Sequence, residues 1–308
     1  MGGGDARVIR LAVRVAREHA DLVTAELMAL SPAGMEERDV DEGTVELAIY
    51  GAPGEVPDLG AVRAAAGDAL VDVSTSEVPD GWEDRWRDWH RPLDIGALRV
   101  RPPWEPARPG ALDVVIEPGQ AFGTGAHAST RLTLELLQTV PPTGPLADWG
   151  CGSGILAVAA ARLAFDPILA CDLDRESVDA TIAAAAANGI EAVEVAAGAS
   201  IPIGPGGLAG AGGPAGAEGP AAAATGILAA RHDLRRAPGP WAPTVTANLV
   251  RPLLLEIAAA MERPPVRLIA SGVLPEEVGE VAGAFGRHGL QVAARRESDG
   301  WSAILLSR

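Results

Sequence analysis

The chain has 308 residues, enough for two domains that each have a core. It contains no lysine, and its 25 arginines against 41 acidic residues leave a net charge of −16, which argues against non-specific nucleic-acid binding and is compatible with a basic protein partner. Two cysteines make neither a disulfide framework nor a zinc cluster, and no apolar run approaches the roughly 20 residues needed to cross a bilayer.

Residues 1–78 are expected to form a small α+β domain. Apolar residues alternate along the first predicted strand, at Ile9, Leu11, Val13 and Val15. The later elements are predicted as a helix at 18–30, strands at 35–39 and 44–50, a helix at 58–70 and a strand at 71–78. The two middle strands are joined by a hairpin turn at 41–43. The order β-α-β-β-α-β predicts a ferredoxin-like arrangement.

Residues 79–110 are predicted to be a Trp-rich helical linker. Trp82, Trp86 and Trp89 are spaced i, i+4, i+7, which places the three indoles on one face of a helix. Such a stripe is more often packing than a cofactor site, and we expect it to fix the small domain against the large one. The prolines that follow it are typical of a connector.

Residues 111–308 carry repeated strand–helix patterns, which predict an α/β domain built on a parallel sheet. One stretch departs from this pattern. Residues 198–226 are almost entirely Gly, Ala and Pro, with Glu218 as their only charged residue. Because they lack large apolar side chains that could offset the entropy of ordering, we predict a disordered surface insertion.

The strongest local signal runs from Leu146 to Leu156, where a short strand ends at Asp148, a glycine loop turns and an apolar helix begins at Ile155. Glycines let a ligand approach the backbone closely, and the helix N-terminus presents free N–H groups to it. The glycine spacing is G-x-G-x-G, whereas dinucleotide-binding loops have G-x-G-x-x-G. In a glycine-rich chain this loop alone is a weak signal.

A second predicted strand, which begins at Ile168 and ends at Asp172, places an acid about 20 residues after the glycine loop. A carboxylate in this position can accept hydrogen bonds from both hydroxyls of a ribose. Asp172 is the better candidate for that role, because Asp174 is placed to begin the next helix as a cap. Loop and acid together predict a nucleotide-like ligand and leave NAD and S-adenosylmethionine as alternatives.

Several longer motifs narrow the choice. The run from Glu117 to Thr130 reads E-P-G-Q-A-F-G-T-G-A-H-A-S-T, and shorter motifs occur at residues 247–249, 271–274 and 300–301. With residues 148–156, these stretches resemble the ribosomal protein L11 methyltransferase family, whose elements are D-P-G-x-A-F-G-T-G-x-H-x-T-T, D-x-G-C-G-S-G-I-L, A-N-I/L and S-G-I-L. The resemblance extends from about residue 82 to the C-terminus, and residues 1–78 agree in size and expected fold.

The resemblance implies a class I methyltransferase with a Rossmann-like sheet, S-adenosylmethionine as methyl donor, and an N-terminal domain that recognises the substrate. The positions that bind the cofactor in the family correspond here to Thr130, Gly150, Gly152, Asp172 and Asn248, with Phe122 beside the cofactor. Asn248 follows the fourth strand of the family pattern, where it would face the transferred methyl and orient the accepting amine. In the plainer alternatives Thr130 is a helix-entry residue and Asn248 a turn residue. His127 is a weaker candidate for a general base.

The sequence departs from the family at three places. Glu117 replaces the usual Asp, residues 243–245 lack the acid usual in the strand before Asn248, and the insertion separates the third and fourth strands of the family pattern. None of these removes a predicted cofactor ligand. These three departures suggest a divergent member of the family. They bear most on the identity of the substrate.

We therefore expect a protein methyltransferase that modifies amino groups, on lysine side chains or at the N-terminus, of ribosomal protein L11, a small basic protein. One alternative is another protein lysine or a small amine as substrate, and another is a non-catalytic S-adenosylmethionine-binding module. An NAD-dependent oxidoreductase is disfavoured by the glycine spacing. We expect a cytoplasmic monomer without metal, direct nucleic-acid contact or membrane contact, since no signal peptide opens the chain and its five histidines lack ligand spacing.

Overall fold

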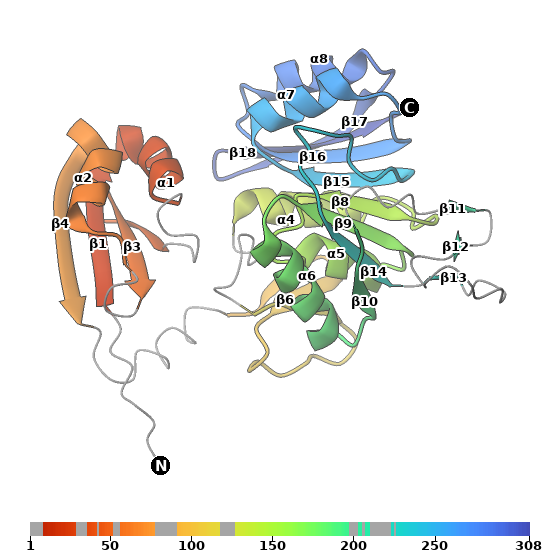
Figure 1. Cartoon of the computed structure of the whole chain (residues 1–308), viewed down its shortest axis with the longest axis horizontal. Coiled ribbons are helices and arrows are strands. Elements are labelled where there is room, and N and C mark those ends of the chain that lie inside the picture. The colour runs from red at the N-terminus through yellow and green to blue at the C-terminus, as the bar shows by residue number, and fades with distance from the viewer. Residues whose placement is uncertain are drawn as a thin grey trace. The chain divides into compact units, whose positions relative to one another are not determined.

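The computed structural model describes residues 9–28, 36–41, 43–51, 56–77, 91–117, 127–196 and 226–308, together with short strands at 203–204, 207–209 and 223–224. The chain divides into two compact units, residues 1–90 and residues 91–308 (Figure 1). The stripe of Trp82, Trp86 and Trp89 and the run that contains Phe122 lie outside the described residues.

The first unit has the predicted ferredoxin-like order. Its elements are β1 (Ile9–Ala16), α1 (Ala20–Met28), β2 (Glu36–Asp39), β3 (Thr44–Gly51), α2 (Leu59–Ala66) and β4 (Leu70–Glu77). The strands form an antiparallel sheet in the order β2-β3-β1-β4. Alternate apolar residues of β1 and β3, among them Leu11, Val13 and Leu47, are buried in one core with Val23 and Val62 of the helices. The period-two pattern of the sequence therefore placed this core correctly.

Glu46 of β3 occupies the middle of a charged cluster in the first unit. Its side chain is only 2% exposed and lies 2.6 Å from Arg10, 2.8 Å from Arg14 and 2.9 Å from Arg38. Burial raises the pKa of this carboxyl, but hydrogen bonds from Arg14 and Arg10 outweigh burial and hold the pKa at about 2. The cluster holds β1, β2 and β3 together and leaves Glu46 ionised.

The second unit begins at Arg91, well before the boundary predicted at residue 111. The second half of the linker that was predicted to be helical, residues 79–110, instead contains the strands β5 (Leu93–Ile95) and β6 (Leu98–Arg101), which form a small sheet with β7 (Leu112–Val115). Leu98 and Val100 are buried in the core of the second unit. The Gln138 side chain donates to the Ile95 carbonyl and accepts from the Ala97 amide. These contacts explain why the segment folds with the larger unit.

The main sheet has the order β10-β14-β9-β8-β15-β16-β18-β17 (Figure 1). Its strands are β8 (Leu146–Trp149), β9 (Ile168–Asp172), β10 (Ala192–Glu194), β14 (Ile227–Arg231), β15 (Thr244–Asn248), β16 (Arg267–Val273), β17 (Gln291–Ser298) and β18 (Trp301–Ser307). The first six in spatial order pair in parallel, and β18 runs antiparallel to both of its neighbours. The predicted Rossmann-like α/β fold is therefore confirmed.

Helices cover both faces of this sheet. They are α4 (Ala128–Leu137), α5 (Ile155–Arg162), α6 (Arg175–Ala187), α7 (Arg251–Ala260) and α8 (Val278–Gly286). Residues of α4, α5 and α6 form one buried cluster, and residues of α7 and α8 form another with the opposite side of the strands. The near-continuous burial of β8 and β9 follows from this three-layer arrangement.

The insertion separates β10 from β14, and β14 rather than β10 is the neighbour of β9. The insertion thus separates the third and fourth strands of the main sheet in chain order, and β14, which was not predicted, adds a strand between the insertion and β15. Within the insertion β11 (Ile203–Gly204), β12 (Gly207–Ala209) and β13 (Ala223–Ala224) pair as a small antiparallel sheet. For the rest, which lies outside the described residues, disorder stays a prediction.

Candidate functional site

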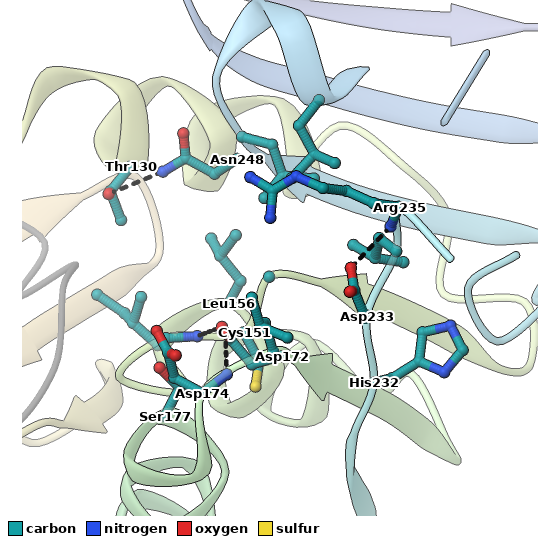
Figure 2. Close-up of a pocket in the computed structure, with 17 residues that line it drawn as sticks. Thr130, Cys151, Leu156, Asp172, Asp174, Ser177, His232, Asp233, Arg235 and Asn248 are labelled. Carbon is teal, nitrogen blue, oxygen red and sulfur yellow. Dashed lines mark hydrogen bonds between the residues drawn. The ribbon is translucent and has the colours of Figure 1, made fainter. Parts of the chain in front are cut away.

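A pocket of about 230 Å³ opens at the carboxyl ends of the parallel strands (Figure 2). It is lined by the loop after β8, the residues that follow β9, β14 and β15, and the first turns of α4, α5 and α7. In open α/β sheets this edge is where ligands bind. The strand order therefore brings five of the sequence-predicted positions together at one place, and these are Thr130, Gly150, Gly152, Asp172 and Asn248.

The glycine loop after β8 has left-handed backbone at Gly150 (φ 78°), Gly152 (φ 50°) and Gly154 (φ 79°). Side chains are disfavoured at such angles. Space is also lacking, because a Cβ on Gly154 would lie 2.7 Å from Cα of Thr181. The turn directs the chain from β8 into α5, which begins at Ile155 as predicted.

The amide groups of this loop are already engaged within the protein. Those of Gly150 and Cys151 donate to the Cys171 carbonyl at 2.8 and 3.0 Å. The Gly152 amide donates to Oδ2 of Asp172 at 3.0 Å, and the Gly154 amide donates to the Cys151 carbonyl at 2.8 Å. The loop therefore offers a ligand its open backbone surface and few free N–H groups.

Asp172 ends β9 and lines the pocket, as predicted. Besides the Gly152 amide it accepts from the Asp174 amide, through Oδ1 at 3.1 Å. Burial raises the pKa of this carboxyl, and the backbone hydrogen bonds oppose the shift. Asp174 occupies the N-cap position of α6, but its side chain makes no capping hydrogen bond and lines the pocket instead. A carboxylate has about four acceptor sites, so these backbone bonds leave Asp172 capacity for hydroxyl donors of a ligand.

Thr130 and Asn248 are joined directly in the pocket. Asn248 is the last residue of β15, and Thr130 lies in the first turn of α4. The Asn248 amide nitrogen donates to Oγ1 of Thr130 at 3.2 Å, across 118 positions of sequence (Figure 2). In this arrangement the amide oxygen of Asn248 is the atom that is not bonded to Thr130. Thr130 is fully buried and is thus more than a residue at which a helix begins.

Asp148 lies at the end of β8 with a side chain that is 0% exposed. Its Oδ1 accepts from the Thr246 hydroxyl at 2.7 Å. Burial raises the pKa of this carboxyl to about 7, although the Thr246 bond opposes the shift and Asp172 adds to it. A neutral carboxyl is therefore available under the glycine loop near neutral pH.

His127 lies at the N-cap of α4 and not in the pocket lining. Its Nδ1 accepts from the Ser129 amide and lies 2.8 Å from Oγ of Ser129. The imidazole packs edge-on against Trp301 with ring centroids 4.7 Å apart. Burial and the neighbouring Arg131 lower its pKa. This geometry makes His127 a helix cap, and it does not support a general base.

The segment from His232 to Arg235, directly after β14, lines the pocket and was missed from the sequence. Asp233, Leu234 and Arg235 all belong to the lining, and Figure 2 shows Asp233 across the pocket from Thr130. The sequence signal that could have indicated this segment is the short apolar run of β14 followed by polar residues. β14 itself had not been predicted. Leu249 and Leu253 were missed as well; Leu249 lies so close to Gly150 that a Cβ there would overlap it.

Among the described residues no group of three or more His, Cys, Asp or Glu side chains is placed to hold a metal ion. In the same part of the chain, no helix has the length and apolar character needed to cross a membrane.

Known proteins resemble this chain in sequence and fold. The family model described as ribosomal protein L11 methyltransferase (PrmA) matches residues 35–202. A ribosomal protein L11 methyltransferase of Burkholderia ambifaria is 30% identical over 97% of this chain and 97% of its own length. Another, of Azotobacter vinelandii, is 33% identical over 80% of this chain and 75% of its own. A solved ribosomal protein L11 methylase structure from Lactobacillus delbrueckii subsp. bulgaricus covers 70% of this chain and 98% of its own, with a TM-score of 0.54 at 22% identity.

Proposed function

Because the chain belongs to the ribosomal protein L11 methyltransferase family, we propose that it transfers methyl groups from S-adenosylmethionine to amino groups of ribosomal protein L11. The observation that carries this proposal is the pocket that joins Thr130 and Asn248 to Asp172 at the carboxyl edge of the sheet. We assign cofactor binding to Thr130, Gly150, Gly152, Asp172 and Asn248, with Phe122 beside the cofactor. Residues 1–78 are assigned to substrate recognition.

The residues present fit S-adenosylmethionine better than NAD. A pyrophosphate needs free N–H groups at the glycine loop, but four loop amides already donate within the protein. The lining has three carboxylates, at Asp172, Asp174 and Asp233, against two basic side chains. This balance disfavours a dianionic ligand and suits one that carries a sulfonium cation. Gly150 lines the pocket with bare backbone, and Asp172 keeps acceptor capacity for ribose hydroxyls.

The chemistry requires little more than alignment from the protein. When bound, S-adenosylmethionine supplies an electrophilic methyl group on its sulfonium sulfur. Since the Asn248 nitrogen is held by Thr130, its Oδ1 is left to accept a hydrogen bond from the incoming amine and to aim the nitrogen lone pair. Partial burial in the pocket favours the neutral form of the amine over its ammonium form. The Thr130 hydroxyl accepts from Asn248 and keeps its own hydrogen to donate to a ligand.

The test is incubation of the protein and purified L11 with methyl-labelled S-adenosylmethionine, followed by mass spectrometry of L11. We expect label on L11 amino groups. Asn248→Ala should lower kcat by about 10- to 100-fold, the range for one lost hydrogen bond to a reacting group, and raise the Kd for S-adenosylmethionine by a smaller factor, because the other assigned residues still hold the cofactor. Equal losses of binding and turnover in this variant would contradict the role given to Asn248.

The remaining alternatives give different results in the same assay. Cofactor binding without label in L11 would point to another protein lysine or to a small amine as substrate. Cofactor binding without turnover on any amine would favour a non-catalytic binding module. We further propose that the enzyme works as a cytoplasmic monomer, without direct contact to nucleic acid or membrane, which accords with its net charge of −16.

A further inference from the structure

Ser271 of β16 lies beside Asn248 and connects three elements around it. The two residues are partners in the register of β15 and β16, and the Leu249 amide donates to the Ser271 carbonyl at 3.0 Å. The Ser271 side chain is 0% exposed, and its Oγ lies 3.1 Å from the Ser129 carbonyl and 3.1 Å from the Ser302 carbonyl. One hydroxyl hydrogen serves both acceptors.

The bond from Ser271 to Ser129 bears directly on Thr130. Ser129 and Thr130 are consecutive in the first turn of α4, where the Ser129 carbonyl also accepts from the Thr133 hydroxyl at 2.8 Å. Ser271 therefore fixes the start of α4 to the sheet at the place where Thr130 must meet Asn248. A shift of α4 at this point would lengthen the 3.2 Å bond that orients the Asn248 amide.

Gly272 adds a steric requirement on the other side of the amide. Its φ is +81°, and a Cβ there would lie 2.6 Å from the Leu249 carbonyl oxygen and 3.1 Å from Oδ1 of Asn248. Contacts of that kind force neighbouring atoms to move. The absent side chain therefore leaves the Asn248 oxygen in place.

We propose that Ser271 and Gly272 are positioning residues that hold the Asn248 amide with its nitrogen on Thr130 and its oxygen toward the accepting amine. Ser271 acts through α4 and through the backbone of Leu249, and Gly272 acts by leaving space. This inference rests on the proposed amine-orienting role of Asn248. Neither residue lines the pocket, so substitutions should affect turnover more than cofactor affinity.

Ser302 provides a matched control for Ser271. It is a serine of the adjacent strand β18, also 0% exposed, and its hydroxyl has no hydrogen-bond partner among the described residues. Ser271→Ala and Ser302→Ala each remove one buried hydroxyl oxygen from adjacent strands of the main sheet. We expect kcat to fall about tenfold in Ser271→Ala, as for one lost hydrogen bond, with the Kd for S-adenosylmethionine within about twofold of the wild-type value. Ser302→Ala should keep kcat within about twofold.

Gly289 is the matched control for Gly272. It has the same φ of +81°, and only Arg308 Nε lies near the position that an added Cβ would take, at 3.9 Å. Gly272→Ala and Gly289→Ala thus share the backbone strain of a left-handed alanine, and only the first pushes on Asn248. We expect a larger fall of kcat in Gly272→Ala than in Gly289→Ala, with a larger loss of Tm as well because the added Cβ also meets the Leu249 carbonyl oxygen, so kcat is compared at a temperature where both variants are folded.

The side-chain amide signal of Asn248 in a ¹⁵N–¹H spectrum, assigned with Asn248→Asp, gives a readout that needs no substrate. It should move in Ser271→Ala and stay in place in Ser302→Ala. The inference is overturned if the signal and kcat are unchanged in Ser271→Ala, or if Ser302→Ala changes both equally. Absence of L11 methylation by the wild-type protein would instead defeat the proposed substrate, and the amide signal would still test the positioning role.

Discussion

Asp148 connects the pocket to a measurable pH dependence of stability. Its pKa in the folded protein is about 7, against an ordinary value of 3.8 in the unfolded chain. Between these two values the folded state binds the additional proton, so this carboxyl makes the free energy of unfolding fall as the pH rises from about 4 to about 7. A shift of about 3 pKa units corresponds to roughly 4 kcal/mol, and the loss is complete above the folded pKa.

Asp148→Asn should remove this dependence. The side-chain oxygen can still accept from Thr246, and the amide stays neutral at every pH. We expect the variant to match the wild-type stability near pH 4 and to exceed it by several kcal/mol near pH 8. Urea unfolding across this range measures the difference, and the titration of Glu46, which lies in the first unit, is the same in both proteins and cancels. Parallel stability profiles for the two proteins would show that Asp148 does not titrate as described.

At the residue scale, the sequence could indicate positions but not contacts. Gly150 and Asp172 were recognisable because each follows or ends a predicted strand, and strand ends of a parallel sheet meet at one edge; Asn248 was indicated by the resemblance to the family. The bond between Thr130 and Asn248 was not predictable, since no local pattern links residues 118 positions apart. His127 illustrates the same limit. A histidine can serve as a helix cap or as a general base, and its residue type does not distinguish the two roles.

At the element scale, the glycine loop gives a prediction with a built-in control. Gly150 and Gly144 both have left-handed backbone, with φ of 78° and 86°. A Cβ on Gly150 would overlap Leu249 in the pocket, whereas nothing lies within 4 Å of one on Gly144. Alanine at either site carries a strain of about 1–2 kcal/mol, but only Gly150→Ala should also weaken S-adenosylmethionine binding, by at least about tenfold.

Calorimetric titration of the two variants with S-adenosylmethionine, together with their Tm values, distinguishes backbone strain from obstruction of the pocket. Both variants should lose Tm, Gly150→Ala the more because its Cβ also displaces Leu249, and loss of binding should be confined to Gly150→Ala. Undiminished binding in Gly150→Ala would mean that the loop surface does not contact the ligand.

Helices and strands with a clear hydrophobic periodicity were predicted from the sequence. Short strands without such a periodicity were missed. The alternation in β1 and the hairpin before β3 gave the first unit its correct order. The strands β5 and β6 were taken for linker because they are short and follow no alternation that distinguishes them from a connector. β14 escaped because it follows a Gly- and Ala-rich segment, and its place in the sheet depends on pairing with β9. Whether such short segments form strands depends on their tertiary contacts.

At the scale of the whole molecule, the net charge of −16 predicts how the enzyme meets a basic protein substrate. Opposite charges accelerate encounter, and salt screens this attraction over roughly 10 Å at 0.1 M. Between about 50 and about 300 mM salt, kcat/KM for L11 should fall several-fold, while kcat at saturating L11 changes little. A kcat/KM that is constant or rises over this range would argue against electrostatic steering.

The order of the main sheet was expected from the resemblance to a known family rather than from the strand patterns. Patterns alone indicated alternating strands and helices, which is compatible with several parallel-sheet topologies. The division of the chain at residue 91 depends on side chains such as Leu98, which packs in the core of the second unit. Composition and periodicity do not show in which unit's core such a side chain is buried.

Every role proposed for the pocket depends on its binding S-adenosylmethionine through the glycine loop and Asp172. Isothermal titration of the full chain with S-adenosylmethionine and, separately, with NAD tests this binding, with Asp172→Asn as the variant and its Tm as the control for folding. We expect saturable binding of S-adenosylmethionine, no binding of NAD, and an affinity lower by about tenfold or more in Asp172→Asn. No heat with S-adenosylmethionine, or tighter binding of NAD, would contradict the assignment of the pocket.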